Sequence, residues 1–469
     1  MTRRGLVLAA MKLGLCLALT ACATTPPTPS PPSLPQAFRN LAEAPSGPGG
    51  SDWWRAFGDP ALNALEARAM AHNLDIAAAV ARVGQARAAA RAAGAANLPV
   101  LVFNPKASRA EQSKLGANGA LVSYFPSYPR SAALYDVTAG ASWELDLFGG
   151  LRREADAARA ERQAADASLA GARLVVAADL ADAYIDYRTL EARLRLAQSS
   201  LAADQRLLDL ATDRYAAGQA PRRDRDAAEA VRAEAAALLP QLRLGLEAER
   251  NRIAVLIGET PETAISELMA PTTGFTTPNL PVGRPGDLLR RRPDLIAAER
   301  QVAAANARVG AALAEYYPKL SLQGLMGFES AQTSNLFTAA AQQSQGVAGL
   351  TWRLFDFGRV DAEVAAARGK TAEALATYRQ AALRACADVE NALAARTGRH
   401  EQAEALWTAA KALRSQQDAA ELAYRAGVTS LTELTDAERQ RLLAEDQAEA
   451  AEGDTARAAV ALIRALGGS

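Results

Sequence analysis

The sequence is poor in the residues that most enzymes and metal sites use. Its 469 residues include only two histidines, His72 and His400, which lie too far apart to indicate a metal site. A Gly-x-Ser-x-Gly elbow, a His-Glu-x-x-His pair and a P-loop are all missing from it. The sequence therefore argues against a hydrolase and predicts a protein with no enzymatic activity, no metal and no cofactor.

Cysteine is also scarce, with three residues in the whole sequence. Cys16 and Cys22 lie in the N-terminal segment, so the three cysteines do not form a disulfide framework. Cys386 stands alone in the helical run LRACADVE, with no histidine close to it in sequence. We interpret it as a small buried side chain rather than a catalytic thiol.

A surplus of one charge sign is missing as well. Lysine plus arginine and aspartate plus glutamate both number 52, so the net charge is zero. A nucleic-acid-binding protein would carry a basic surplus, so the charge balance argues against a nucleic acid as partner. Aromatic residues make up only 5%, whereas alanine, leucine, glutamate and arginine are frequent. This composition is typical of long helices and coiled coils.

The N-terminus reads as an export signal. Residues 1–21 have a basic start and a short apolar run that Lys12 interrupts, which is typical of a secretory signal that starts at Met1 or Met11. The ending LTAC resembles a bacterial lipobox, in which Cys22 is acylated, for example with palmitate, and becomes the first residue. Three acyl chains would hold the protein firmly in a membrane. The alternative is an ordinary signal with a chance cysteine.

Residue 23 is alanine and not the aspartate that usually retains lipoproteins at the inner membrane, so the outer membrane is favoured. Residues 22–50 then form a proline-rich, lipid-anchored tether, whose composition cannot pack a core.

The rest of the chain consists of two similar sequence repeats. The phrase WELDLFGG begins at Trp143 and the phrase WRLFDFGR begins at Trp352, 209 residues later. The same offset holds for later matches, which indicates a tandem duplication. We expect a first repeat at 51–258 and a second at 287–469. The segment 259–286 between them is rich in proline and glycine and is predicted to be a linker.

Each repeat carries two strand-like segments, near 98–107 and 136–147 in the first and near 319–328 and 346–356 in the second. The clearest of them alternates apolar and polar residues from Val137 to Leu147, which predicts one apolar and one polar face. About ten residues suffice for a tilted strand to span a bilayer. Two soluble hairpins on a helical body remain the alternative.

A sheet in lipid cannot leave an open edge, because each unpaired backbone group there costs several kcal/mol. Four strands cannot close a barrel, so several chains must pool their strands. Two chains would give eight strands and a filled barrel, whereas three would give twelve and a lumen. Trp143 and Trp352 would then lie near the membrane–water interface.

The helical stretches carry a heptad seam. Leu194, Leu201, Leu208 and Tyr215 are seven residues apart, and Asp204 interrupts this apolar series. Heptads predict coiled-coil contacts. A continuous helix from 150 to 218 would be about 100 Å long, which is enough to reach far across a periplasm.

Four quoted segments carry a family resemblance. They are DWWRAFGDPALNALEARAMAHNLDIAAAVARVGQARA, LLRRRPDLIAAERQVAAANARVG, YYPKLSL and YRAGVTSLTELTDAERQ. Together they resemble the outer-membrane efflux lipoproteins of the TolC/OprM/NodT family over about residues 40–468.

The resemblance implies a mainly α protein with a β-barrel portion. Three chains would form a channel-tunnel, in which each chain gives four strands to a twelve-stranded outer-membrane barrel. The helices would form an α-barrel in the periplasm, with an equatorial domain midway. The resemblance also implies partners: a periplasmic adaptor, or membrane fusion protein, and an inner-membrane transporter of the RND or another type. Such a protein is the passive exit duct of a tripartite pump for drugs or other small molecules. A lipid-anchored coiled-coil scaffold without a pore is the alternative.

The resemblance further places a periplasmic gate at two helix–helix turns, whose glycines, Gly218 and Gly427, are expected to contact the adaptor. The family's ring of carboxylates falls six and nine residues after the second glycine, at Glu433 and Asp436. The other implied gate residues are Tyr215, Tyr424, Asp224 and Asp226.

One position departs from the family pattern. Some members carry, two residues after the second turn glycine, an arginine that holds the gate by an ion pair, and here this residue is Thr429. Arg425 or Arg222 could supply the missing charge.

Overall fold

The computed structural model describes residues 32, 34–40, 52–111, 113, 131–269, 276, 278 and 282–468. Cys22, the signal and most of the tether lie outside the described residues. No described helix is both long enough and apolar enough to cross a membrane.

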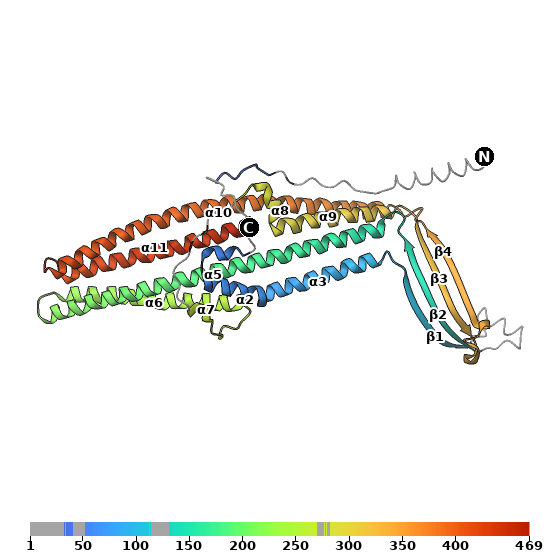
Figure 1. The fold of residues 1–469 in the computed structure, drawn as a ribbon, viewed down its shortest axis with the longest axis horizontal. Coiled ribbons are helices and arrows are strands. Elements are labelled where there is room, and N and C mark those ends of the chain that lie inside the picture. The colour runs from blue at the N-terminus through green and yellow to red at the C-terminus, as the bar shows by residue number, and fades with distance from the viewer. Residues whose placement is uncertain are drawn as a thin grey trace. The chain divides into compact units, whose positions relative to one another are not determined.

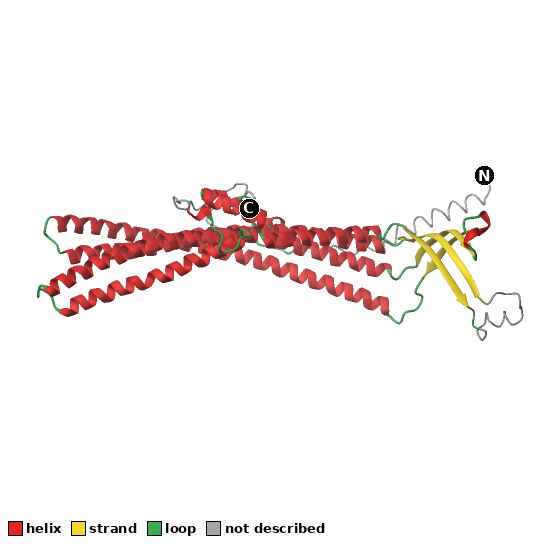
Figure 2. Cartoon of the chain, turned by 90° about the horizontal axis from the view of Figure 1, so that it is seen from below, coloured by secondary structure: helices red, strands yellow, loops and turns green. Residues whose placement is uncertain are grey.

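The described chain contains four strands and a series of helices (Figures 1 and 2). In chain order the elements are η1 (Trp53–Phe57), α2 (Pro60–His72), α3 (Leu74–Ala95), β1 (Val100–Glu111), β2 (Ser131–Leu145), α5 (Gly150–Ala216), α6 (Arg222–Leu256), α7 (Ser266–Met269), η2 (Pro285–Asp287), α8 (Leu288–Arg291), α9 (Pro293–Ala314), β3 (Lys319–Ser330), η3 (Thr333–Asn335), η4 (Ala339–Ala341), β4 (Gln342–Thr351), α10 (Arg359–Arg425) and α11 (Leu431–Leu466).

The repeated sequence folds into repeated elements. Helices α5 and α10 both have 67 residues, and α6 and α11 have 35 and 36. Three pairs of glycines 209 residues apart have positive φ angles that agree within 14°: Gly149 and Gly358, Gly218 and Gly427, and Gly258 and Gly467. Because glycine has no Cβ, it adopts this left-handed backbone without strain.

The chain divides into two compact units, and each takes segments from both sequence repeats. The described part of the strand unit comprises residues 84–163 and 300–376 without the gaps given above. The helical unit comprises the described parts of 31–83, 164–299 and 377–469.

In the strand unit the sheet is antiparallel, with the order β1-β2-β3-β4. Its register pairs Phe103 with Ala139, Ala139 with Met326 and Met326 with Ser344. Since side chains alternate between faces, Phe103, Ala139 and Met326 share one face, which is the predicted apolar one. The neighbouring row, Val102, Gly140, Leu325 and Gln345, lies on the opposite face.

The last strand differs from its sequence-based limits. The alternation predicted a strand near 346–356, but β4 ends at Thr351. The chain turns here because Trp352 donates its indole N–H to the Tyr316 carbonyl (3.0 Å) and Asp356 accepts the backbone N–H groups of Gly358 and Val360 at 3.1 and 3.0 Å. The two Asp356 bonds cap the start of α10, and Trp352 lies just outside the strand.

The helical unit has an apolar core, in which Phe57, Leu62, Tyr184 and Ile253 are fully buried. Helix α2 starts at Pro60 because the Asp59 carboxylate caps it, accepting the N–H groups of the next residues.

Part of the predicted heptad seam packs as expected in the helical unit. Leu194 and Leu201 of α5 contact a buried cluster that contains Ala197, Leu239 and Leu242. Helices α5 and α6 therefore pack along this seam.

Candidate functional site

The two helix–helix turns named above have matching geometry. Gly218 and Gly427 have φ angles of 70° and 71°, and a Cβ built on either would meet no atom within 4 Å. In each turn the residue after the glycine donates its N–H to the carbonyl five residues earlier, Gln219 to Arg214 and Val428 to Ala423. This pattern is the Schellman motif, which satisfies the last carbonyls of α5 and α10.

Glu433 is held within its own turn. It forms a capping box with Ser430 at the start of α11, in which Ser430 N–H donates to the carboxylate (3.1 Å) and Glu433 N–H donates to the Ser430 hydroxyl (3.2 Å). The Thr429 hydroxyl donates to the same carboxylate. Thr429, the departure from the family pattern, therefore binds Glu433, one of the two acids predicted for the gate.

Asp436 also has partners on its own helix. Arg439 donates to one carboxylate oxygen at 3.1 Å and Gln440 to the other at 2.9 Å, while the Asp436 side chain stays half exposed. The two arginines considered as substitutes pair with other acids and not with Asp436. Arg425 pairs with Glu421, and Arg222 pairs with Asp226. Within one chain, Arg439 is the cation that neutralises Asp436.

The first turn collects the remaining predicted gate residues. The Arg225 guanidinium lies 5.4 Å from the centre of the Tyr215 ring and 2.7 Å from Asp226. Arg223 pairs with Asp224 at 3.3 Å. In the second turn the Tyr424 carbonyl accepts the N–H of Gly427 at 2.9 Å, and the side chain is 40% exposed. The predicted residues of each turn lie close together, but among the described residues no hydrogen bond, ion pair or ring contact joins the two turns.

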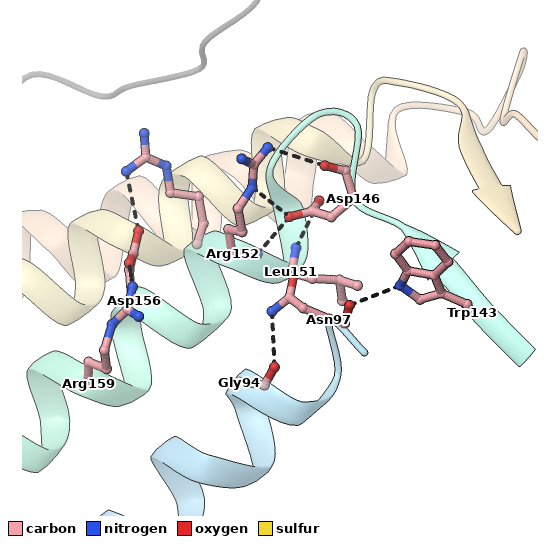
Figure 3. A network of polar contacts seen from close by, with 9 residues as sticks. Gly94, Asn97, Trp143, Asp146, Leu151, Arg152, Asp156 and Arg159 are labelled. Atoms are coloured by element: carbon pink, nitrogen blue, oxygen red, sulfur yellow. Dashed lines mark hydrogen bonds and ion pairs between the residues drawn. The ribbon is translucent and has the colours of Figure 1, made fainter. Parts of the chain in front are cut away.

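The two tryptophans tie strands to helix ends. Figure 3 shows the Trp143 indole directed at Asn97, whose carbonyl accepts its N–H at 2.9 Å. Trp352 makes the equivalent bond to Tyr316, 219 residues after Asn97. Both rings remain partly exposed, at 37% and 53%. The sequence located these residues but did not predict the bond.

A ladder of ion pairs joins α5 to α11, and the sequence reasoning missed it. Near one end of the ladder Asp186 pairs with Arg457 and Asp179 with Arg464; further along, Arg193 binds Asp446 through two bonds (2.8 and 3.1 Å) and Arg206 binds Glu438 at 2.5 Å. In the first two ion pairs α5 supplies the carboxylate, whereas in the last two α11 supplies it. The seven-residue spacing within Asp179–Asp186 and within Arg457–Arg464 was the available signal.

The N-terminal segment is also held by a carboxylate. Glu390 on α10 accepts the backbone N–H groups of Arg39 and Asn40 at 2.5 and 3.1 Å, and Phe38 beside them is buried. Cys386, one helical turn earlier, is half-buried, and burial raises the pKa of its thiol. The interpretation of Cys386 as a small buried side chain therefore holds only in part, because the side chain is half-buried.

Comparison with known proteins identifies the family. The model of the outer membrane efflux protein family matches residues 65–259 and 285–468. The pyoverdine export outer membrane protein OpmQ of Pseudomonas putida is 34% identical, over 97% of this chain and 96% of that protein. Outer membrane protein OprJ of Pseudomonas aeruginosa is 29% identical over 97% of this chain and 94% of its own length.

Solved structures agree. The outer-membrane channel OprN is 34% identical and superimposes with a TM-score of 0.84 over 95% of this chain and 99% of its own. The open-state MtrE channel of Neisseria gonorrhoeae is 29% identical, with a TM-score of 0.83 over 94% of this chain and 97% of its own. The predicted fold class, a channel-tunnel protomer that brings four strands to a barrel, is confirmed. The scaffold without a pore finds no support, and this outer-membrane efflux channel belongs to the outer membrane efflux protein family.

Proposed function

We propose that three copies of this chain form the exit duct of a tripartite pump, together with a periplasmic adaptor and an inner-membrane transporter. The main support for a trimer is that the four-stranded sheet of one chain is open at both edges. Strands β1 and β4 are both edges of the four-stranded order, and lipid does not tolerate unpaired backbone groups. Joining β1 of one copy to β4 of the next removes both edges, and twelve strands leave a lumen.

The two sheet faces support this orientation. The face with Phe103, Met326 and Trp143 suits lipid, and Trp143 near the end of β2 suits the interface, as does Trp352 just after β4. The other face is hollowed to about 290 Å³ around Ser142, Gln323 and Gln345. Such polar side chains suit a water-filled passage.

Acylation of Cys22 would add a second attachment to the outer membrane, and the capture of residues 39 and 40 by Glu390 would fix the tether to the helical unit. Labelling with radioactive palmitate tests the modification, and a Cys22→Ser variant should take up none. Equal labelling of both proteins would exclude Cys22 as the acylated residue.

At the periplasmic turns, we assign the gate to Asp436 and Glu433, with Tyr215, Tyr424, Asp224 and Asp226 around them. Three copies of an acid around an axis repel one another and favour cations over anions. Arg439 offsets part of this charge at Asp436. The open space beside Gly218 and Gly427 would admit a hairpin of the adaptor, which opens the gate.

Native gels and recordings in planar bilayers test the trimeric duct and the assignment of the gate residues. The purified protein should run as a trimer on native gels and give discrete conductance steps, whereas a monomer without steps would refute the duct. The E433A/D436A variant should conduct more in the closed state. E247A/E404A, which removes two exposed acids away from the turns, is the matched control and should not. Equal currents in both variants would remove Glu433 and Asp436 from the gate.

A further inference from the structure

The residue that interrupts the heptad seam, Asp204, is buried in the helical unit. It is only 2% exposed, and its Oδ1 atom has no hydrogen-bond partner among the described residues. A buried carboxylate oxygen without a hydrogen-bond partner is costly, because it loses its hydration without an equivalent bond in the folded protein. Its place in an otherwise apolar seam therefore calls for a compensating group.

A pocket of about 240 Å³ lies beside this carboxylate, between α5, α6 and α11. Its apolar wall consists of leucine, valine and alanine side chains, among them Leu196, Leu238, Leu442 and Val231. Its polar atoms come from Ser200, Asp204, Glu234, Arg439 and Asp446. The volume lies below the range of pockets for drug-sized ligands, so only a small molecule fits.

The charges around the pocket do not balance. Asp446 is bound by Arg193 through two hydrogen bonds, and Arg439 is bound to Asp436. Among the described residues, neither Asp204 nor the exposed Glu234, the other two carboxylates of the pocket, has a cation within ion-pair distance. The site therefore favours a cation.

We propose that this pocket binds a small organic cation, whose ammonium group pairs with Asp204 and whose apolar part contacts the leucines of α5, α6 and α11. A bare metal ion fits less well, because most of the wall offers no oxygen ligands. An anion would meet two unpaired carboxylates. The inference goes beyond the proposed duct and does not depend on it, since binding is measured without transport.

The titration of Asp204 is consistent with this assignment. Burial raises the pKa of its carboxyl group, while the positive charge of Arg439 works in the opposite direction. The ionised form is therefore incompletely compensated within the chain, and an ammonium group in the pocket would stabilise it.

Isothermal titration calorimetry on the purified full-length protein, with phenethylammonium as the probe, tests the proposal. 2-Phenylethanol has the same carbon skeleton without the charge, and phenylacetate carries the opposite charge. We expect phenethylammonium to bind at least tenfold more tightly than 2-phenylethanol, and phenylacetate not to bind. Equal binding of the amine and the alcohol, or no heat from the amine at any concentration up to 50-fold above that of the protein, would overturn the proposal.

Two variants locate the site. Asp204→Asn keeps the shape and removes the charge, and should weaken amine binding at least tenfold. Asp209→Asn is the matched control, because Asp209 is exposed on the same helix and bonded to Gln205 at 2.9 Å, and it should leave binding unchanged. Unchanged binding in Asp204→Asn would refute the site.

A third variant guards against misfolding of Asp204→Asn. Ala235→Leu leaves Asp204 in place and fills the pocket, so it should also abolish binding. If Ala235→Leu binds the amine like the unaltered protein, the cation does not occupy this pocket.

Discussion

The contact between α5 and α11 gives a prediction whose size follows from the structure. A Cβ atom added at Gly453 would meet Oγ1 of Thr189 at 2.3 Å, its Cγ2 at 3.0 Å and its Cβ at 3.1 Å. Rotation of the threonine side chain does not relieve the clash, because both branches and the Cβ lie within reach. Gly453→Ala must therefore push the two helices apart.

Overpacking of this kind costs about 1–3 kcal/mol. Replacing a helical glycine by alanine returns about 0.5–1 kcal/mol through the backbone. We expect a net loss of about 1–2 kcal/mol, which corresponds to roughly 5- to 30-fold faster hydrogen exchange in the parts of α5 and α11 around these residues.

The control is Gly398→Ala on α10, where an added Cβ meets nothing within 4 Å. This variant should slow exchange locally, since only the backbone gain remains. Adding Thr189→Ala to Gly453→Ala removes Oγ1 and Cγ2 and should restore most of the protection. Equal effects of Gly453→Ala and Gly398→Ala, or no rescue by Thr189→Ala, would refute the reasoning.

Three further predictions concern individual contacts. Trp143→Phe and Trp352→Phe each lose one indole hydrogen bond and should each cost about 1 kcal/mol in urea unfolding; an unchanged midpoint would contradict this. Burial, reinforced by the charge of Asp186, raises the pKa of Asp182 from 3.8 to about 6, so the folded protein retains a proton that the unfolded chain releases, and stability should fall as pH rises through this window. Asp182→Asn should flatten the slope in thermal unfolding curves, and an identical slope would exclude Asp182 as its source. Glu390→Gln should speed trypsin cleavage after Arg39 several-fold, because the amide nitrogen cannot accept and one of the two backbone hydrogen bonds is lost; equal cleavage rates would show that Glu390 does not hold the segment.

The sequence predicts this fold well where a repeat or an alternating pattern coincides with a residue that ends an element, such as a turn glycine. The 209-residue offset between Trp143 and Trp352 anticipated two helices of equal length that end at matched glycines. Alternation located β2, but it could not stop β4 at Thr351, because the bonds of Trp352 and Asp356 that end the strand depend on groups brought near by folding.

The candidate gate was predictable only in part. The turn glycines and the acids could be placed by spacing from a known motif, whereas their partners could not. That Glu433 closes a capping box with Ser430 follows from local sequence, and S-x-x-E is a recognisable signal. The ladder between α5 and α11 joins residues more than 230 positions apart, so no local pattern specifies which arginine meets which carboxylate.

The equal lengths of α5 and α10 limit how this protein can change during evolution. One inserted residue would turn everything beyond it by about 100° around the helix axis and separate the arginines from their acids. An insertion of seven residues nearly restores the facing side, but only if the antiparallel partner grows by the same amount. Longer or shorter descendants should therefore differ by whole heptads, added together in α5 and α11 and again in their counterparts from the other repeat.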